Sequence, residues 1–423
     1  MSNISISDTV SKELPLKTKL RKAERRNKMR AYSLILPLGA FILIFFIAPI
    51  INVLVLSVDN PLLVDNFPKT VKSISQWNPT IDELPAENVY AAFAAEMKKA
   101  AKEKTIGRIA TRLNYDKGGI RSLMTKTARK MKRMDVTQAP PKGTWQKTLL
   151  KIDKRWGKQE FWATIKNASK PLTAGYFLAA IDKKYDNDGS IIDAPDFKQI
   201  YLIVFWRTVW ISALVTLTSV LLGDPVSFLL ANMPLRYSNL LMILVLLPFW
   251  TSLLVRTTAW IVVLQTQGVL NDLLIFLGLI NDRIQLIYNR FGVIVAMTHI
   301  LLPFMILPIY SVMKNISPDY VRAARSLGAN QWTSFWKVYF PQSVPGIGAG
   351  GLLVFILALG YYITPALVGG PRDQMASYFI AFHTNSSLNW GLAAALGTIL
   401  LFGVLAVYWV YDKLVGIDNM KLG

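Results

Sequence analysis

Long apolar runs alternate with polar connections along this chain, and six of the runs are long enough to cross a bilayer. A transmembrane helix needs about 20 consecutive, mainly apolar residues to span the hydrocarbon core. The six windows lie at approximately 31–58, 201–222, 240–264, 291–312, 345–368 and 392–411. The pattern therefore predicts an all-α membrane protein with six transmembrane helices.

The first apolar run begins directly after a polar, basic tail and raises the question of a cleaved signal peptide. A signal peptide has an apolar region of about 7–15 residues followed by a small-residue cleavage site. The run at 31–58 is longer and has no clear site of that kind. We therefore expect a retained first transmembrane helix. Composition agrees, since 52% of the 423 residues are hydrophobic and the mean hydropathy is +0.35.

Charge predicts the orientation of the spans. Basic segments that flank transmembrane helices remain on the cytoplasmic side. The basic tail at 1–30 is therefore expected on the cytoplasmic side of the membrane, and alternation places 233–239, 313–343 and 412–423 on that side as well. Both termini are then cytoplasmic. The formal charge of +21 resembles that of nucleic-acid-binding proteins, but the apolar spans exclude that class, and basic membrane-flanking loops explain part of the charge.

The long connection at 59–199 is predicted to lie outside the cell membrane. It holds 26 Lys and Arg against 16 Asp and Glu, but long loops are translocated largely regardless of charge. Helical spacing is expected over 84–106 and over 143–165, and 184–193 has the composition of a turn-rich connector. One stripe of the second helical stretch consists of Trp145, Leu149, Ile152 and Trp156. This helical insertion is either a solvated addition packed on the membrane domain or a docking surface for an extracytoplasmic partner.

The residues that enzymes and metal sites require are scarce. Cys is absent and only two His occur, so neither a thiolate site nor a histidine-rich metal site is expected. No G-x-x-x-x-G-K-[ST] phosphate loop occurs, and "GKQE" at 157–160 lacks its spacing and its Ser or Thr. The Ser and Thr residues at 251–258 have no His or paired carboxylate near them in sequence. We therefore expect neither catalytic residues nor a cofactor in this chain, which disfavours a membrane-embedded enzyme.

A charged amphipathic segment lies between the fourth and fifth apolar runs. Ser317 is a favoured N-cap, Pro318 suits the first helical position, and Asp319 complements the positive end of the helix dipole. A helix over 320–327 should follow, and Gly328 is placed to end it in the left-handed conformation. A second amphipathic turn, "NQWTSFWKVYF", is expected to stop at Pro341. These two short helices form a compact cytoplasmic element, which an isolated pore would not need.

The spacing of residues in this segment resembles a motif of ABC importers. In the inner-membrane permease subunits of that family, the last large cytoplasmic loop carries Glu-Ala-Ala, three residues, Gly, nine residues, then Ile-x-Leu-Pro. Here Arg replaces the Glu. The resemblance implies that the segment is the coupling helix, which docks on a separate cytoplasmic ATPase. The residues that it assigns to coupling are Arg322, Ala323, Ala324, Gly328, Val338, Phe340 and Pro341.

Other stretches are similar to the spermidine/putrescine-type branch of these permeases, in particular to its B-type subunit. They lie at 246–280, 301–316 and 351–370; the likeness is loose over 31–58, close over 200–415 and absent from 59–199. It implies the type I ABC importer permease fold with a five-helix core at 200–415 and a cytoplasmic tail at 416–423. It also implies a second permease subunit, a binding protein, and an ATPase dimer that binds the ATP and Mg. The implied solute is a polyamine, with opines and amino-acid derivatives as alternatives.

Charged and aromatic residues in the spans are the candidates for a translocation route. A charge at the bilayer centre costs at least ~2.5–3.5 kcal/mol, so Arg256 should face the bundle interior or water. Arg207, nearer a span end, is expected to extend to the interface, and Asp224 either pairs with an arginine or is an interfacial carboxylate. The aromatic residues could stack on a solute or only pack in the core. The candidate route comprises Trp250, Arg256, Trp260, Tyr361 and Tyr362.

Overall fold

The structure is a computed structural model that describes residues 16–134 and 144–415, in two units, Met1–Val55 and Leu56–Gly423. The described residues contain six helices that are long and apolar enough to cross a membrane, which confirms the predicted number. These are Glu24–Leu56, Asp196–Asn232, Leu253–Phe276, Arg290–Lys314, Gln331–Leu359 and Trp390–Lys413.

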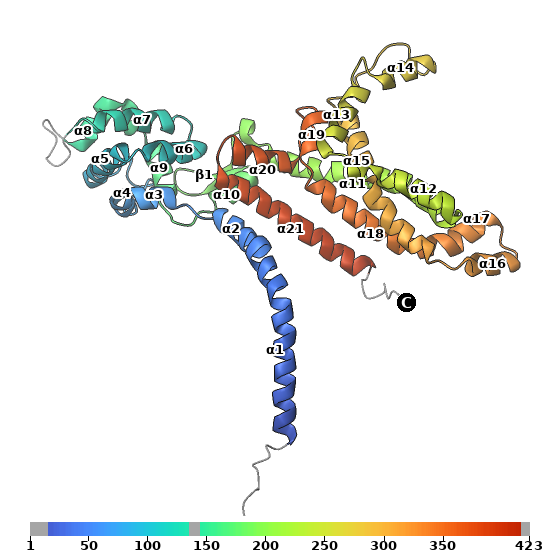
Figure 1. Cartoon of the computed structure of the whole chain (residues 1–423). Coiled ribbons are helices and arrows are strands. Elements are labelled where there is room, and N and C mark those ends of the chain that lie inside the picture. The colour runs from blue at the N-terminus through green and yellow to red at the C-terminus, as the bar shows by residue number, and fades with distance from the viewer. Residues whose placement is uncertain (1–15, 135–143, 416–423) are drawn as a thin grey trace, which may run out of the picture. The chain divides into compact units, whose positions relative to one another are not determined.

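The first unit is one nearly continuous helix (Figure 1). It consists of α1 (Leu16–Ile42), a π-helical turn η1 (Leu43–Ile47) and α2 (Ala48–Leu56). Its apolar side chains are exposed all round, as Leu34 at 81% and Phe45 at 63% illustrate. A helix that is apolar on every side needs lipid or another protein around it. Its length and composition agree with the predicted first span.

The helical bundle at the centre of the second unit is built on α15 (Arg290–Lys314). α11 (Tyr201–Asn232) and α18 (Phe340–Leu359) pack against it and against each other, and α21 (Trp390–Val415) contacts α18 (Figure 1). Smaller helices surround them: α12 (Leu235–Leu246), η4 (Leu247–Trp250), α13 (Leu253–Leu264), α14 (Val269–Phe276), α16 (Pro318–Ser326), α17 (Gln331–Ser334), η5 (Phe335–Tyr339), α19 (Ile363–Val368) and α20 (Ala376–Asn385).

The third predicted span, 240–264, is wrong as a single helix. α12 and η4 end at Trp250, and Thr251 is extended, with φ −100° and ψ 144°. Pro248 opens the short 3₁₀ turn η4 that precedes this break, because proline lacks the N–H that would continue the helical hydrogen bonds. The helix that can span the membrane is instead Leu253–Phe276, made of α13 and α14, and α12 belongs to a shorter apolar helix, Leu235–Trp250.

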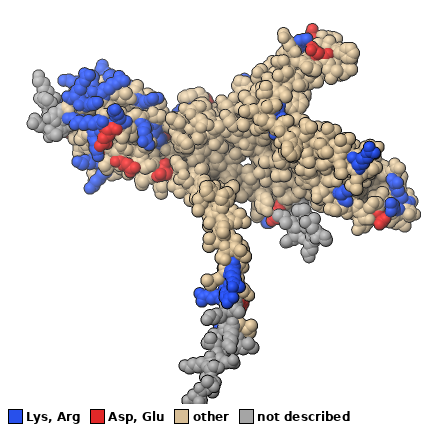
Figure 2. Space-filling view, viewed as in Figure 1, with Lys and Arg blue, Asp and Glu red and all other residues tan. Residues whose placement is uncertain are grey.

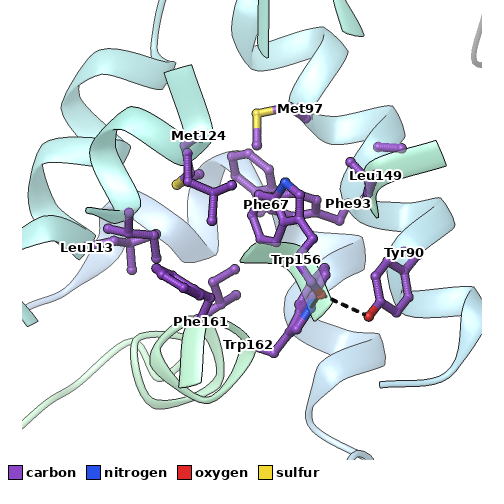
Figure 3. Close-up of a cluster of buried hydrophobic side chains, with 14 of the residues drawn as sticks. Phe67, Tyr90, Phe93, Met97, Leu113, Met124, Leu149, Trp156, Phe161 and Trp162 are labelled. Atoms are coloured by element: carbon purple, nitrogen blue, oxygen red, sulfur yellow. Dashed lines mark hydrogen bonds between the residues drawn. The ribbon is translucent and has the colours of Figure 1, made fainter. Parts of the chain in front are cut away.

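The insertion is a helical domain with its own hydrophobic core. Its helices surround a cluster of aromatic and aliphatic side chains, drawn in Figure 3, in which Phe93, Trp156 and Trp162 contact one another. The predicted stripe at positions 145, 149, 152 and 156 is buried in that core. Its elements are α3 (Pro61–Asn66), α4 (Pro68–Ile74), α5 (Glu87–Lys102), α6 (Ile106–Asp116), α7 (Ile120–Met131), α8 (Trp145–Ile152), η2 (Lys154–Gly157), α9 (Gln159–Asn167), α10 (Gly175–Ala180) and η3 (Asp196–Lys198).

A β-hairpin replaces the connector expected at 184–193. β1 (Lys183–Tyr185) pairs antiparallel with β2 (Ile191–Asp193). The turn was predictable, since Asp188 accepts hydrogen bonds from Ser190 and Gly189 has a φ of +87°. The strands were not, because three residues are too few to show a two-residue periodicity.

Asp153 fixes the junction between α8 and η2. Its carboxylate accepts hydrogen bonds from the guanidinium and backbone N–H of Arg155, and its Oδ2 lies 2.9 Å from Lys126 Nζ. These bonds, that of the Arg155 side chain above all, hold the pKa of the Asp153 carboxyl well below its ordinary value. A depressed carboxyl pKa stabilises the folded state above the pKa of the unfolded chain, and the contribution is lost as pH falls.

We therefore expect Asp153→Asn to lower the free energy of unfolding of the insertion at neutral pH by about 1–3 kcal/mol. The difference from wild type should shrink as the pH falls below about 4, because the carboxyl of the unfolded wild-type chain then takes up a proton while that of the folded protein stays ionised. Thermal unfolding followed by tryptophan fluorescence between pH 3 and pH 7 measures this. A stability difference between wild type and Asp153→Asn that stays constant across that pH range would contradict the stabilising role of the ionised Asp153 carboxylate.

The insertion is bonded to the first turns of two membrane helices, in a region that we call the seam. Asp182 caps α11, because its carboxylate accepts hydrogen bonds from the N–H groups of Ile200, Tyr201 and Leu202 at 2.9–3.0 Å. At α21, the Tyr176 ring from α10 lies directly on Gly391, where a Cβ atom would overlap it. The insertion is thus packed against α11, which follows it in sequence, and against α21, which is distant in sequence.

Gly391→Ala should disturb the seam, because the added methyl group collides with the Tyr176 ring. Overpacking of this kind costs typically about 1–3 kcal/mol, so we expect a lower melting temperature of the detergent-purified protein. Gly397→Ala is the matched control, since it lies on the same helix and its Cβ would meet nothing within 4 Å. Equal melting temperatures of the two variants would show that α10 does not press on α21.

Candidate coupling and translocation sites

The coupling segment, residues 317–341, has the local geometry that its sequence predicts at its start. Ser317 Oγ accepts a hydrogen bond from the Asp319 N–H at 3.3 Å, and α16 begins with Pro318 at its first position. Gly328 follows α16 with a φ of +92°. This left-handed conformation lets the N–H groups of Gly328 and Ala329 bond to carbonyls of the last turn of α16. α16 and α17 therefore meet at this glycine.

The surface of the coupling segment is exposed and partly apolar. Leu327 is 90% exposed and Trp332 is 72% exposed. Arg322, the residue in the place of the family's Glu, lies 3.1 Å from Asp319, and both side chains are more than three-quarters exposed. An exposed ion pair of this kind contributes little to stability. Large exposed apolar side chains beside charged ones are typical of protein-docking surfaces.

Pro341 does not end the second helix, contrary to the sequence prediction. α17, η5 and α18 run on as one helix, Gln331–Leu359, with Pro341 in the first turn of α18. The π-helical turn η5 makes this possible, because the N–H of Phe340 bonds to Phe335 O, five residues back, and shifts the hydrogen-bond register before the proline. The coupling segment is therefore continuous with a membrane-spanning helix.

Aromatic contacts fix this junction to α11. The Phe228 ring meets the rings of Phe335 and Tyr339 edge-on, with centroids 5.4 and 5.2 Å apart, and Asn232 donates a hydrogen bond to the Tyr339 hydroxyl at 3.2 Å. A cavity of about 930 Å³ lies beside these rings, between α11 and the coupling segment, and Asp224 lines it. Asp224 Oδ1 is buried and has no hydrogen-bond partner among the described residues, so of the two alternatives for this residue the pairing with an arginine is not found there.

Arg256 lies between three elements of the bundle. Its Nε and Nη1 are buried and have no hydrogen-bond partner among the described residues. His299 on α15 and Tyr361, at the end of α18, lie within electrostatic reach of its guanidinium. On the next turn of α13, the Trp260 Nε1–H donates to His299 Nδ1 at 3.1 Å. Arg256 thus faces the bundle interior.

The structure brings together three of the five predicted route residues and separates the other two. Arg256 lies within electrostatic reach of both His299 and Tyr361, and Trp260 donates to His299, but Trp250 is 88% exposed at the end of η4. Tyr362 is 41% exposed, and its ring lies 6.3 Å from that of Tyr378. Trp250 is separated from the others because the helix break places it on a different segment from Arg256. Tyr362 is separated because its side chain points in a different direction from that of its neighbour Tyr361.

Sequence inspection missed two polar partners in this region. His299 is one of only two histidines and lies within a span, which was the available signal. The Thr257 and Thr364 hydroxyls lie 3.1 Å apart and join α13 to α19, a pairing that no sequence spacing indicates. Arg207, which is expected to extend to the interface, donates a hydrogen bond to the Gln374 carbonyl at 3.2 Å.

The family described as binding-protein-dependent transport system inner membrane component matches residues 223–415. The spermidine/putrescine transport system permease protein PotB of Haemophilus influenzae is 36% identical over 221 residues, which cover 52% of this chain and 77% of that protein. PotB of Escherichia coli K12 is 33% identical over 218 residues, 51% of this chain and 79% of that one. The chain belongs to this family of ABC importer permeases.

The similarity to solved structures is weaker than the similarity to the PotB sequences. A chain of the bacterial alginate ABC transporter aligns over 53% of this permease and 80% of its own length, with 18% identity and a TM-score of 0.44. The matched family region of this permease begins after the insertion and contains the coupling segment as well as Arg256. As its relatives are transport permeases, the chain is a transport protein and not an enzyme.

If Arg256 contributes to solute movement by this permease, its removal should affect transport more than assembly. We expect Arg256→Met to lower solute uptake by about tenfold or more, equivalent to ~1.4 kcal/mol of lost interaction, because the guanidinium charge disappears from the bundle interior. Uptake of labelled solute, normalised to the amount of permease in the membrane, measures this. Arg236→Met, at an exposed position on α12, is the matched control. An equal effect of both variants would remove Arg256 from the route.

Proposed function

We propose that this permease imports a small cationic organic solute of the polyamine class. Two observations support the solute class: the relatives named as spermidine/putrescine permeases are 33–36% identical, and most of their length is covered. The observation that carries the transport mechanism is the capped coupling segment that continues into α18. A binding protein delivers the solute, and the permease exposes its route alternately to either side of the membrane.

The energy for this cycle comes from a separate ATPase dimer that binds ATP and Mg. The chain has no phosphate loop of its own, so nucleotide chemistry belongs to a partner. The partner docks on the exposed residues around Arg322, Ala323, Ala324 and Gly328. Its closure pushes α16, and the continuous helix Gln331–Leu359 transmits the displacement, since a stiff helix moves as a body where a flexible loop would absorb the motion.

The assembly also contains a second permease subunit, distinct from this one, in a bacterial inner membrane. Exposed apolar side chains on α13 and on the first span support a further membrane-embedded partner beside lipid. The basic segment before the first span supports a cytoplasmic N-terminus. With six spans, the C-terminus lies on the same side and the insertion lies outside.

A second candidate solute class carries a carboxylate as well as an amine, as amino-acid derivatives and opines do. Arg256 favours it, because a guanidinium whose buried Nε and Nη1 have no partner among the described residues is well matched to a carboxylate. A thermal-shift screen of the binding protein against polyamines and amino-acid derivatives separates the two classes. Stabilisation by putrescine or spermidine alone supports the first class, and stabilisation by the derivatives alone supports the second.

Coupling should depend on the left-handed turn at Gly328. Valine at a φ of +92° is strained by about 1–3 kcal/mol, so Gly328→Val should reorient α16 and abolish ATP-driven uptake while the protein stays in the membrane. Gly278→Val is a matched control for backbone strain, because Gly278 has a φ of +68° and open space around it but lies outside the coupling segment. Normal uptake by Gly328→Val would refute the coupling role.

A further inference from the structure

The insertion carries a concentrated positive charge on one side, which we call the basic face. It comprises the exposed lysine and arginine side chains of α7, of the residues directly after it, and of α8 and η2. Figure 2 shows Lys and Arg gathered on this part of the insertion. The members of the basic face are Arg121, Lys126, Arg129, Lys130, Lys132, Arg133, Lys147, Lys151 and Lys154.

The basic face is poorly neutralised. The described segments that form it, 120–134 and 144–157, contain one acidic residue, Asp153. Of the members of the basic face, only Lys126 has a carboxylate partner among the described residues, and that partner is Asp153. Elsewhere on the insertion charges are paired, as in Lys117 with Glu160 and Lys183 with Asp193. Like charges at this density repel one another, so the arrangement does not serve the stability of the insertion.

The surface of the basic face also contains a groove. A groove of about 640 Å³ runs where α7, α8 and η2 meet, with lysine side chains at positions 126, 147, 151 and 154 along it. Leu150 and Ile152 supply apolar lining between the lysines, and Asp153, whose carboxylate is paired with Lys126 and Arg155, also lines the groove. A groove with cationic edges and an apolar lining suits an acidic protein segment that also presents an apolar side chain. A flat layer of lipid headgroups would not enter it.

The position of the basic face in the fold suits a docking role. α7 and α8 pack on other elements of the insertion, and the seam lies elsewhere, at α10 and the residues before α11. The Tyr115 hydroxyl on α6 also donates to the Ser387 carbonyl, just before α21. A partner on the basic face would therefore bind the outward part of a domain that is bonded to α11 and α21. A cationic solute would be repelled from this face, which excludes it as the solute route.

We propose that the basic face is the docking surface for an acidic face of the solute-binding protein. This inference rests on the proposed function, which supplies that partner. Complementary charge speeds encounter and fixes orientation, and its contribution weakens with salt because the Debye length falls from about 10 Å at 0.1 M to about 3 Å at 1 M. The insertion then gives this permease a receptor for its binding protein that the matched family region, 223–415, does not contain.

The test uses the complete transporter in phosphatidylcholine liposomes, with solute-loaded binding protein added outside at a series of concentrations. The basic-face variant is Lys147→Glu, Lys151→Glu and Lys154→Glu together, which leaves the Lys126–Asp153 pair intact. The matched control is Lys69→Glu, Lys72→Glu and Lys170→Glu, three exposed lysines outside the basic face. Deletion of the insertion is a poor test, because Asp182 caps α11.

We expect the basic-face variant to need about tenfold more binding protein for half-maximal uptake, at an unchanged maximal rate, while the control matches wild type. The wild-type requirement should rise with added salt. If wild type, the basic-face variant and the control need the same concentration of binding protein for half-maximal uptake, the basic face is not a docking surface, and the proposed function is unaffected. Uptake by wild type that is independent of the binding protein would refute the proposed function itself. A defect that appears only in liposomes containing phosphatidylglycerol would assign the face to the membrane and overturn the proposal.

Discussion

Close packing of α11 and α18 on α15 is the interaction on which the other features of this permease depend. Lipid tails are as apolar as the side chains between the helices, so helices in a membrane associate through tight contact and hydrogen bonds instead of the hydrophobic effect. Glycines make that contact possible. A Cβ at Gly223 would lie 3.0 Å from Met305, one at Gly346 would lie 3.0 Å from Ile309, and one at Gly350 would lie 3.0 Å from Met305 O. α15 is the shared surface in all three cases.

The functional features are arranged around these packed helices. The coupling segment joins α15 to α18, so a displacement of α16 acts on both helices of one packed pair. Hydroxyl contacts hold the same bundle together, as between Thr218 and Thr298 at 2.7 Å. Several buried hydroxyl groups of the bundle and buried atoms of Arg256 and Asp224 have no hydrogen-bond partner among the described residues. The two charged residues matter most, because an unpaired charged group in a membrane protein costs several kcal/mol. Charged residues within membrane spans are rare and commonly mark functional sites.

The insertion differs from a loose surface loop in the way that it is attached. Its aromatic core is complete without the membrane helices, yet Asp182 caps α11 and Tyr176 packs on Gly391 of α21. Folding of the insertion and positioning of these two helix ends are therefore linked. A domain attached in this way can convey the docking proposed for its basic face to the bundle, which a flexible loop would not do.

The sequence alone determined the number of spans, the helical nature of the insertion, the membership in a permease family, and the cap and glycine at either end of α16. These features depend on local properties: apolar length, helical periodicity, and the backbone preferences of Ser, Pro and Gly. Only the tertiary structure decided that the third span breaks after Trp250, that Gln331–Leu359 is one helix through Pro341, and that Arg256 meets His299 while Trp250 does not. Those outcomes depend on hydrogen-bond register and on contacts between residues distant in sequence, neither of which is visible in the spacing of a single sequence.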